Sequence, residues 1–492
     1  MKTTVQSNVV INLIRTITMT LLSFVTFPMV TRILGDSALG SFSWATSFVY
    51  YFTILAKISI PNIAVRECAK IKNDPDKLSM KIQEFFILQC IMTLISFMLM
   101  SVIVFSVPLF KENNIDQLIF IVSMNFLCAT FAFEWVFTAL GKQTYLAIRS
   151  IVILAFVDIL IFALIRYKEN LFLYAFLTTS VNLLTVVSNL IYLPKLIKFK
   201  KTQKYNFKQY IPALSILFLI SVFASIYDKT DSFILGIIDP SKAQVGSYVV
   251  GMKAVEIIIG IIVALGGVFT PKASEFIEQN DEQKFANLIK FSINICFIIV
   301  VPSIALLISM ANPITSLMAG MVGYKDAATI LISLASLCLT FSLSQIIYTQ
   351  ILIPMKKEKI YLYAIIVGSI LNIASSLLFG LLVFKDNPGV GISIATAISD
   401  LIVLIILIVK TWENVKNNLF NFNNLKILIL GGIIFLVSYF VGPLIFNASF
   451  EVVDYQFALL IELLSMFIIS FIIYVLGLLL SKEKLVRSII HK

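Results

Sequence analysis

Long apolar stretches alternate with short polar breaks from one end of the chain to the other. A helix that crosses a hydrocarbon core of about 30 Å needs roughly 20 predominantly apolar residues. The pattern predicts fourteen such helices, at 9–34, 41–63, 83–108, 116–140, 143–165, 170–193, 210–238, 243–269, 286–310, 327–352, 360–384, 389–410, 425–446 and 455–480. The connections are too short for a folded extramembrane domain. We interpret the first run as a membrane helix because it is too long for a signal peptide and lacks a cleavage site.

The composition agrees with an all-α, polytopic membrane protein. Of 492 residues, 59% are hydrophobic and 13% are charged, which leaves too few polar residues to cover a soluble core. The five cysteines show no CxxC spacing, and the one histidine, His491, lies next to the C-terminus. We therefore expect no metal site, no cofactor and no catalytic residues.

The net charge of +11 follows the predicted topology. If the N-terminus is cytoplasmic, the loops on that side carry 26 Lys and Arg residues and the opposite loops carry 7, with 5 inside the spans. This asymmetry follows the positive-inside rule and places both termini in the cytoplasm. It also accounts for the basic character without nucleic-acid binding.

A short internal similarity suggests a repeat. "ALGSFSWATSF" follows the first predicted helix and "QVGSYVVGMKA" follows the seventh, so that Gly40 and Gly246 are 206 residues apart. Two six-helix lobes with the same orientation are typical of transporters that work by alternating access. We predict an N-terminal lobe at 1–208, a C-terminal lobe at 209–416, and two further helices with a cytoplasmic tail at 417–492.

Charged residues inside the predicted spans are few, and each costs roughly 2.5–3.5 kcal/mol at a helix centre. Such residues normally face a bundle interior or a watery cavity, although those near helix ends can extend to the interface. Lys57 and Glu134 are the most open to that second interpretation. The cations are Arg15, Lys57, Arg149, Lys229 and Lys253, and the acids include Glu134, Asp158, Asp228, Asp231, Glu256, Asp400 and Glu462.

Several of these charges have two interpretations. Lys229 either pairs with an acid on a neighbouring helix or faces a cavity, with Asp228 and Asp231 as gating or coupling groups. Lys253 and Glu256 are three residues apart and could form a pair within one helix. Arg15 continues a polar stripe with Asn8 and Asn12, which favours a cavity position. Arg149 and Asp158 lie on opposite faces of one helix, and Asn182 and Asn189 share a face that either lines a cavity or joins helices.

A membrane cavity with surplus cations favours an anionic substrate, because Arg and Lys bind phosphate oxygens. A polar headgroup with a pyrophosphate fits, with its lipid tail left in the bilayer. The chain has no GxxxxGK[ST] phosphate loop, so ATP does not drive it directly.

The segment "NLIRTITMTLLSFVTFPMVTRILGDSALGSFSWATSFVYYFTILAKISIPNIAVRECAKI" closely resembles the start of the polysaccharide repeat-unit flippases. These are the O-antigen and capsule transporters of the multidrug/oligosaccharidyl-lipid/polysaccharide exporter superfamily. Further similar segments are "DKTDSFILG", "VGSYVVGMKAVE", "TPKASE", "QILIPMKKEK" and "GVGISIATAISD", spread over nearly the whole chain.

The resemblance implies two six-helix lobes around a central cationic cavity, two extra helices, and a non-enzymatic function. That function is to flip undecaprenyl-pyrophosphate-linked oligosaccharide to the outer leaflet of the cytoplasmic membrane, for surface polysaccharide such as lipopolysaccharide or capsule. Partners expected on this basis are the lipid-linked oligosaccharide, membrane lipids, a coupling proton or sodium ion, and a polysaccharide polymerase with its chain-length proteins. Substrate-binding candidates are Arg15, Lys57, Arg149, Lys229 and Lys253, and coupling or gating candidates are Asp158, Asp228, Asp231, Glu256 and Asp400.

Three other functions remain in view. A multidrug cation antiporter of the same superfamily would need an acid-dominated cavity, which five intramembrane cations disfavour. A peptidoglycan-precursor flippase is a close relative, but the opening segment fits the polysaccharide branch better. A polysaccharide polymerase should carry a long outer loop with Arg-rich motifs, and the sequence has none.

Overall fold

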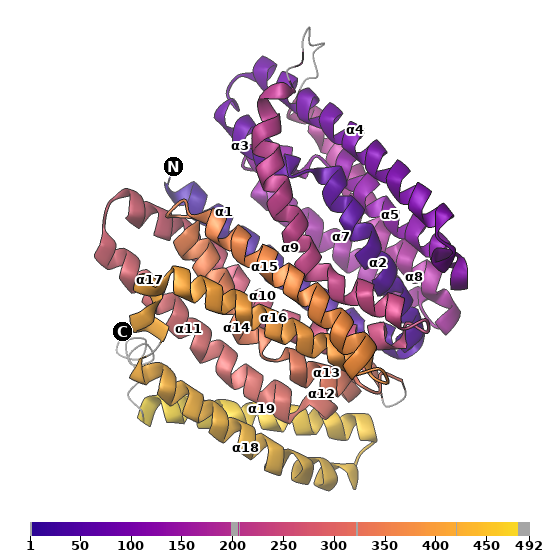
Figure 1. The fold of residues 1–492 in the computed structure, drawn as a ribbon, viewed down its shortest axis with the longest axis vertical. Coiled ribbons are helices and arrows are strands. Elements are labelled where there is room, and N and C mark those ends of the chain that lie inside the picture. The colour runs from indigo at the N-terminus through magenta and orange to yellow at the C-terminus, as the bar shows by residue number, and fades with distance from the viewer. Residues whose placement is uncertain (1, 198–204, 206, 321–322, 420, 481–492) are drawn as a thin grey trace. The chain divides into compact units, whose positions relative to one another are not determined.

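The computed structural model describes residues 2–197, 205, 207–320, 323–419 and 421–480, and none of these residues forms a β-strand. Thirteen helical segments within this part of the chain are long and apolar enough to cross a membrane. A further apolar stretch, Leu217–Tyr227, lies within the helix predicted as the seventh span. The all-helical, polytopic prediction is confirmed (Figure 1).

Contacts divide the chain into two compact units, Met1–Val245 and Gly246–Lys492. The helices that lie in the first unit are α1 (Lys2–Leu34), α2 (Asp36–Lys57), α3 (Ile60–Lys70), α4 (Pro75–Ser106), α5 (Ile115–Phe131), α6 (Glu134–Ala139), α7 (Gln143–Leu164), α8 (Leu171–Tyr192) and α9 (Ile211–Ile238), with short turns at η1 (Pro108–Asn114), η2 (Lys168–Asn170), η3 (Leu193–Lys195) and η4 (Lys208–Tyr210).

Helix α10 (Ala243–Glu278) begins at the end of the first unit and belongs mainly to the second. The other elements of the second unit are α11 (Glu282–Ser309), α12 (Ala311–Ala319), α13 (Ala327–Leu334), α14 (Leu337–Ile346), η5 (Ile347–Leu352), α15 (Glu358–Leu378), η6 (Phe379–Val383), α16 (Pro388–Lys410), α17 (Trp412–Leu419), α18 (Phe422–Phe450) and α19 (Tyr455–Leu480).

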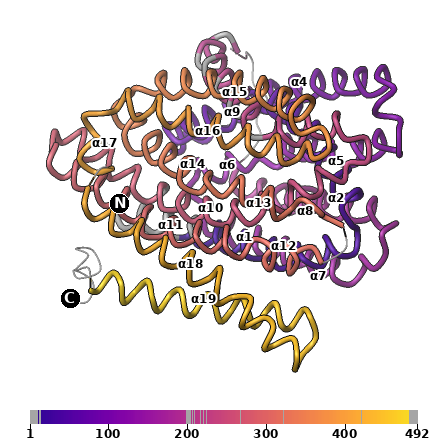
Figure 2. The backbone as a smooth tube through the Cα atoms, turned by 60° about the horizontal axis from the view of Figure 1, so that its bottom comes forward, coloured from indigo at the N-terminus to yellow at the C-terminus, as the bar shows by residue number. Residues whose placement is uncertain are grey.

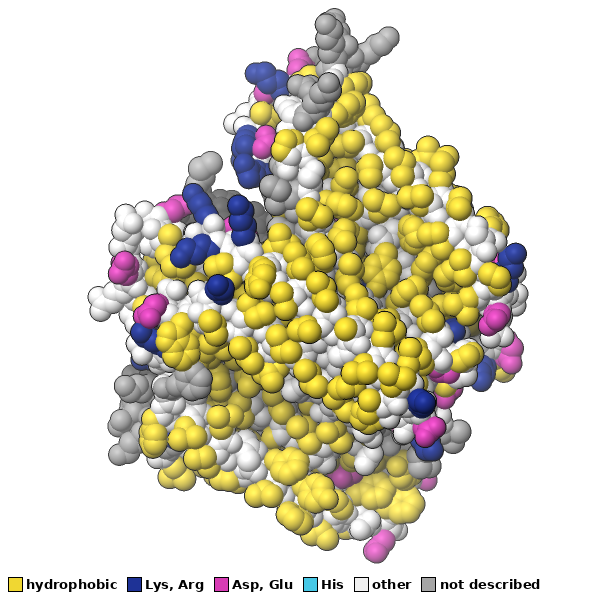
Figure 3. All heavy atoms as spheres, viewed as in Figure 1, with side chains coloured by type: hydrophobic (Ala, Val, Ile, Leu, Met, Phe, Trp, Pro, Cys, Tyr) yellow, Lys and Arg dark blue, Asp and Glu magenta, His cyan; other side chains and the backbone are white. Residues whose placement is uncertain are grey.

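The helix flanks are apolar where they face outward. Large hydrophobic side chains stay exposed along α4, α7, α18 and α19, for example Val102, Ile159, Phe440 and Phe467, each more than half exposed. On the face drawn in Figure 3, hydrophobic side chains cover most of the surface and charged ones gather toward its margins. Lipid can solvate such flanks because a helix pairs its own backbone groups.

One helix-capping pattern occurs in both units. The Asp74 carboxylate accepts a hydrogen bond from the Lys77 backbone N–H at 3.1 Å and pairs with its ammonium, which starts α4. The Asp281 carboxylate makes the same two contacts with Lys284 at the start of α11. These hydrogen bonds hold the pKa of Asp74 and Asp281 below its usual value. The matching segments, "NDPDK" and "NDEQK", lie 207 residues apart, one more than the 206 residues that separate Gly40 and Gly246 in the predicted repeat.

Two helices of the first unit break where the sequence predicts continuous spans. After α2, Ile58 and Ser59 take left-handed conformations, and α3 then starts with Pro61 in its first turn. After α5, Phe133 has a φ of 51°, and α6 starts at Glu134. The short helices α3 and α6 contact one another. Because each break interrupts the backbone hydrogen-bond ladder, polar side chains collect beside it.

Helices α2 and α9 pack closely around Trp44. Its indole Nε1–H donates to the Phe233 carbonyl at 3.0 Å, and its ring lies so near α9 that a Cβ on Gly236 would come within 2.2 Å of it. The Lys242 ammonium lies 4.2 Å from the ring centroid and donates to the Gly236 carbonyl at 2.5 Å. Burial lowers the pKa of Lys242, whereas Asp239 and Glu112 oppose that shift.

Helix α9 therefore packs with the first unit, although the repeat assigns it to the second lobe. The predicted boundary near residue 208 divides the chain by the repeat of its helices, whereas the two compact units divide it by contacts between residues. The division into repeats stays a prediction.

Helices α18 and α19 form an antiparallel pair (Figure 2). The buried hydroxyls of Ser438 and Ser470 lie 3.2 Å apart between the two helices, and the Tyr474 hydroxyl donates to the Ile298 carbonyl of α11 at 2.8 Å. Such hydrogen bonds join helices in lipid, where polar groups lack water. The predicted cytoplasmic tail lies outside the described residues.

Candidate functional site

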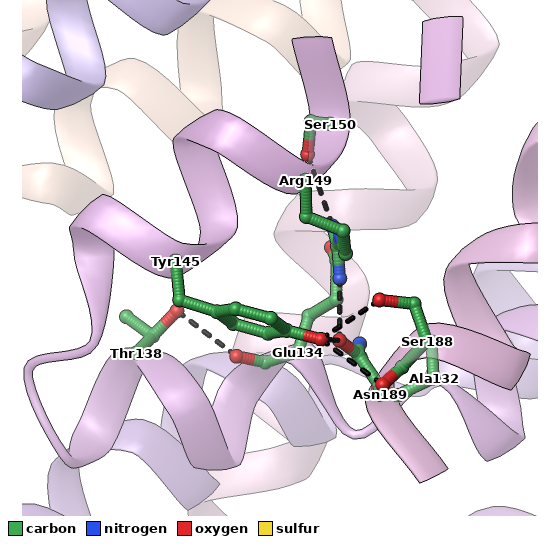
Figure 4. A network of polar contacts seen from close by, with 8 residues as sticks. All are labelled: Ala132, Glu134, Thr138, Tyr145, Arg149, Ser150, Ser188 and Asn189. Atoms are coloured by element: carbon green, nitrogen blue, oxygen red, sulfur yellow. Dashed lines mark hydrogen bonds and ion pairs between the residues drawn. The ribbon is translucent and has the colours of Figure 1, made fainter. Parts of the chain in front are cut away.

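The buried guanidinium of Arg149 is the centre of a polar network in the first unit (Figure 4). It lies in the second turn of α7, and its side chain is 5% exposed. Its Nη1 donates to Asn189 Oδ1 at 2.7 Å, and its Nη2 donates to Ser150 Oγ at 3.0 Å and to the Glu134 carboxylate. A buried charge needs such partners, because removing one leaves an uncompensated charge at high cost.

Asn189 connects Arg149 to the break between α5 and α6. Its Nδ2 donates to the Ala132 carbonyl at 2.5 Å, while its Oδ1 accepts from Arg149. The break frees this carbonyl from the helical ladder, and the amide satisfies it. One side chain of α8 thereby joins α5 and α7.

Tyr145 supports the other side of the network. Its hydroxyl lies 3.1 Å from Asn189 Oδ1 and 2.9 Å from Ser188 Oγ, and its ring centroid lies 5.9 Å from the Arg149 guanidinium carbon. The rings of Phe137 and Tyr192 pack against it. These contacts hold Arg149 in one orientation, since both its charge and its plane have partners.

Glu134 differs from the rest of the network because its side chain is 44% exposed. It is the first residue of α6, directly after the left-handed Phe133. The sequence left its role open between a cavity position and an interfacial one, and it is absent from the predicted site residues. Nothing in "FAFEWVF" signals the helix break that brings its carboxylate to Arg149.

Two further predicted cations lie around the same carboxylate. Arg15, half-exposed on α1, is within electrostatic range of Glu134 and Arg149, and Lys57, exposed at the end of α2, is within range of Glu134. Three cations from three helices thus interact electrostatically with one acid, and among the described side chains Arg149 forms the ion pair with it. The cluster keeps a net positive charge, which favours an anion.

The other two predicted cations, Lys229 and Lys253, have described contacts of their own. Lys229, on α9, lies 5.7 Å from the ring centroid of Tyr50 on α2. Lys253 lies on α10 and pairs with Glu256 at 3.5 Å, which realises the intrahelical pair that the spacing allows. Within the first unit, the described interactions bring Arg15, Lys57 and Arg149 to the same carboxylate.

The predicted acids occupy different environments. Asp158 is buried on α7 against Thr26 of α1, with its Oδ2 unpaired among the described atoms. Asp231 is buried on α9, and Asp400, buried on α16, accepts a hydrogen bond from Thr340. The side chain of Asp228 lies outside those described, as do Asn8 and Asn12. Within the described ranges, no group of three His, Cys, Asp or Glu residues is placed to hold a metal ion.

Asn182 and Asn189 join helices, which is one of the two interpretations that their spacing allowed. Asn182 Nδ2 donates to Asn125 Oδ1 at 2.8 Å, and Asn189 reaches Ala132, so both link α8 to the α5 region. Asn189 also binds Arg149. The sequence signal for this second role was weak, because a shared helix face does not reveal what lies opposite.

Comparison with known proteins identifies the family. The profile of the family described as "Polysaccharide biosynthesis protein" matches residues 5–277, more than half of the chain. The chain belongs to this family. It is a membrane transporter of the multidrug/oligosaccharidyl-lipid/polysaccharide exporter superfamily, as the resemblance predicted. The profile of the MatE family also matches residues 217–378, and a search of curated proteins found no match.

Solved structures share the fold. One, described as "Lipid II flippase MurJ, inward closed conformation", is 17% identical with a TM-score of 0.65, over 96% of this chain and 99% of that chain. Another, described as the inward-facing conformation of a multidrug resistance MATE family transporter of the MOP superfamily, is 14% identical with a TM-score of 0.58, over 81% of this chain and 96% of that chain. At these identities the likeness establishes the fold alone.

Proposed function

We propose that this transporter flips undecaprenyl-pyrophosphate-linked oligosaccharide repeat units from the cytoplasmic to the outer leaflet by alternating access. The observation that carries the proposal is the excess of positive charge around Glu134, where Arg15, Lys57 and Arg149 share one acid among the described side chains. A pyrophosphate linkage can neutralise that excess, because guanidinium and ammonium groups bind phosphate oxygens with short, charge-assisted hydrogen bonds.

The cluster lies at one end of its helices. Arg15 is near the start of the apolar part of α1, Lys57 ends α2, and Arg149 is near the start of α7. With the termini in the cytoplasm, as the loop charges indicate, this end is in the cytoplasmic half of the bilayer. We infer that the site receives the headgroup from the cytoplasmic side of the cytoplasmic membrane, while the lipid tail stays among apolar chains.

Lys229, Lys253 and the acids complete the proposed route. We assign Lys229 and Lys253 to later contacts with the anionic headgroup, and Asp158, Asp228, Asp231, Glu256 and Asp400 to gating or to coupling with a proton or sodium ion. Asp158 supports this assignment best, because a buried carboxylate with an unpaired oxygen can exchange a cation. Product would pass to a polysaccharide polymerase with its chain-length proteins.

Substitution of the cations tests the proposal. We expect Arg15→Ala and Lys229→Ala to abolish surface polysaccharide while each protein inserts in the membrane at normal levels. The measurement is surface polymer in a strain whose only flippase is the variant, with immunoblotting of membranes. Lys72→Ala, an exposed cation between α3 and α4, is the matched control and should leave polymer unchanged. Normal polymer from both test variants would refute the cationic site.

The main alternative is export of cationic drugs, since the MatE profile matches residues 217–378. A cationic drug would meet repulsion from the cluster around Glu134. Drug susceptibility of the same deletion strain separates the two functions. A flippase for anionic lipids predicts unchanged susceptibility and lost polymer.

A further inference from the structure

We propose that Glu134 occupies the place of a substrate phosphate on Arg149 when the site is empty, and that the pyrophosphate displaces it on binding. This inference rests on the proposed function and adds a role for a carboxylate that the function itself does not require.

The two partners are held very differently. Arg149 is 5% exposed, and Asn189, Ser150 and the ring of Tyr145 fix it from three sides. The Glu134 side chain is 44% exposed, and the one contact of its carboxylate that the structure shows among the described side chains is with Arg149. The guanidinium is therefore a fixed group, and the carboxylate is the group that can move away.

We infer that an anion approaches Arg149 from the side of Glu134, because the side chain of Glu134 is 44% exposed whereas that of Arg149 is 5% exposed. Asn189, Ser150 and the ring of Tyr145 already contact the guanidinium from other directions. The exposed carboxylate thus lies between the buried cation and the open side of the site. A phosphate that arrives from this side takes the position of the carboxylate on Nη2.

Arg149 also keeps an unused donor for that exchange. Its Nε is buried without a partner among the described atoms, whereas Glu134 contacts only Nη2. A phosphate can accept hydrogen bonds from two guanidinium nitrogens at once, which a carboxylate held at one nitrogen does not do here. Because a buried donor without a partner is costly, the second hydrogen bond favours phosphate over Glu134.

The neighbouring cations strengthen the exchange. Arg15 and Lys57 both interact with the charge of Glu134. When the carboxylate leaves, these two cations and Arg149 are available to the arriving pyrophosphate. A pyrophosphate carries more negative charge than one carboxylate and neutralises the cluster more fully. In the empty state Glu134 spares Arg149 from being buried without a counter-ion.

Glu134→Gln tests the inference, because glutamine keeps the size of the side chain and removes its charge. We expect the purified full chain in detergent to bind inorganic pyrophosphate about tenfold or more tightly when this competitor is lost. The matched control, Glu413→Gln, removes a 79% exposed acid that pairs with Lys416 on α17, and its affinity should equal that of the wild type. The measurement is isothermal titration calorimetry, with thermal unfolding as the check on folding.

The outcomes separate this inference from the proposed function. If the wild type binds pyrophosphate, Arg149→Gln does not, and Glu134→Gln binds equally or more weakly, then Glu134 is only a structural tether and the inference is overturned while the function stands. If neither the wild type nor Glu134→Gln binds, the anion site itself is wrong. If Glu134→Gln does not fold, Glu134→Asp is measured in its place. Its shorter side chain should compete less well for Arg149, so this variant should also bind pyrophosphate more tightly than the wild type does.

Discussion

At the scale of one residue, Arg149 meets two requirements that usually conflict. A cation inside a membrane protein must be held by partners, and a cation that binds substrate must keep donors free. The planar guanidinium meets both demands, because Nη1 and one side of Nη2 anchor it to Asn189 and Ser150 while Nε stays unpaired. An ammonium at the same position has no fixed fork of donors to divide in this way.

Arg149→Lys should therefore fail although it keeps the charge. We expect the lysine to lose the contact with either Asn189 or Glu134, because one compact ammonium cannot span both. Surface polymer should fall at least about tenfold, as for the loss of a charge-assisted contact. A lysine variant that exports polymer at the wild-type rate would show that charge alone matters at this position. Asn189→Leu removes one anchor of the guanidinium and keeps Arg149. This variant therefore separates the effect of the guanidinium's orientation from the effect of its charge.

The sequence named Arg15, Lys57 and Arg149 as candidates, because a charge inside an apolar run is visible without any structure. It undervalued Glu134 and Tyr145 for a physical reason. Both act through the break at Phe133, which has no proline or glycine to announce it. The break before α3 was more readable, since Pro61 favours a helix start.

At the scale of elements, the close approach of α2 and α9 depends on a missing side chain. Gly236 leaves room for the indole of Trp44, and Lys242 then covers the ring and the last carbonyls of α9. The hydroxyl pair Tyr51–Thr230 continues the contact between the helices, and the pair Ser59–Ser221 joins α9 to the break that follows α2. The two helices are thus joined at several points along their length.

Gly236→Ala should destabilise this contact. Its Cβ would overlap the indole, and overpacking of a tight site costs about 1–3 kcal/mol. We expect a lower melting temperature in detergent than that of the wild type. Gly260→Ala, in the interior of α10 with nothing within 4 Å of the new Cβ, is the control and should be neutral or stabilising. Equal melting temperatures for the two variants would contradict the packing described around Trp44.

At the scale of the whole molecule, the sequence predicted the number of helices well and their interruptions poorly. A membrane-spanning helix needs a continuous run of apolar residues, so the spans can be recognised from the sequence. Breaks are tolerated wherever protein satisfies the freed backbone groups, and those partners come from distant helices such as α8. The sequence offered one further sign of the predicted repeat, because "NDPDK" and "NDEQK" each form the same cap.

The orientation of the whole chain is the remaining prediction at this scale. Loop charges place Lys72 in the cytoplasm and Lys111 outside. We expect a membrane-impermeant maleimide to label Lys111→Cys in intact cells and Lys72→Cys only after permeabilisation. Four of the five natural cysteines are buried and Cys90 is half-buried, so the unsubstituted chain is the background control. Labelling in the reverse pattern would invert the topology and move the Glu134 site to the outer half of the bilayer.

The setting of Trp44 gives this transporter a built-in optical reporter. The chain has three tryptophans, and replacing Trp135 and Trp412 with phenylalanine leaves the emission of one indole that is enclosed by Phe110, the backbone of α9 and the Lys242 ammonium. Separation of α2 from α9 would admit water or lipid headgroups to that ring and shift its fluorescence to longer wavelength. Any step of the conformational cycle that separates these two helices can thus be followed in real time without attaching any dye.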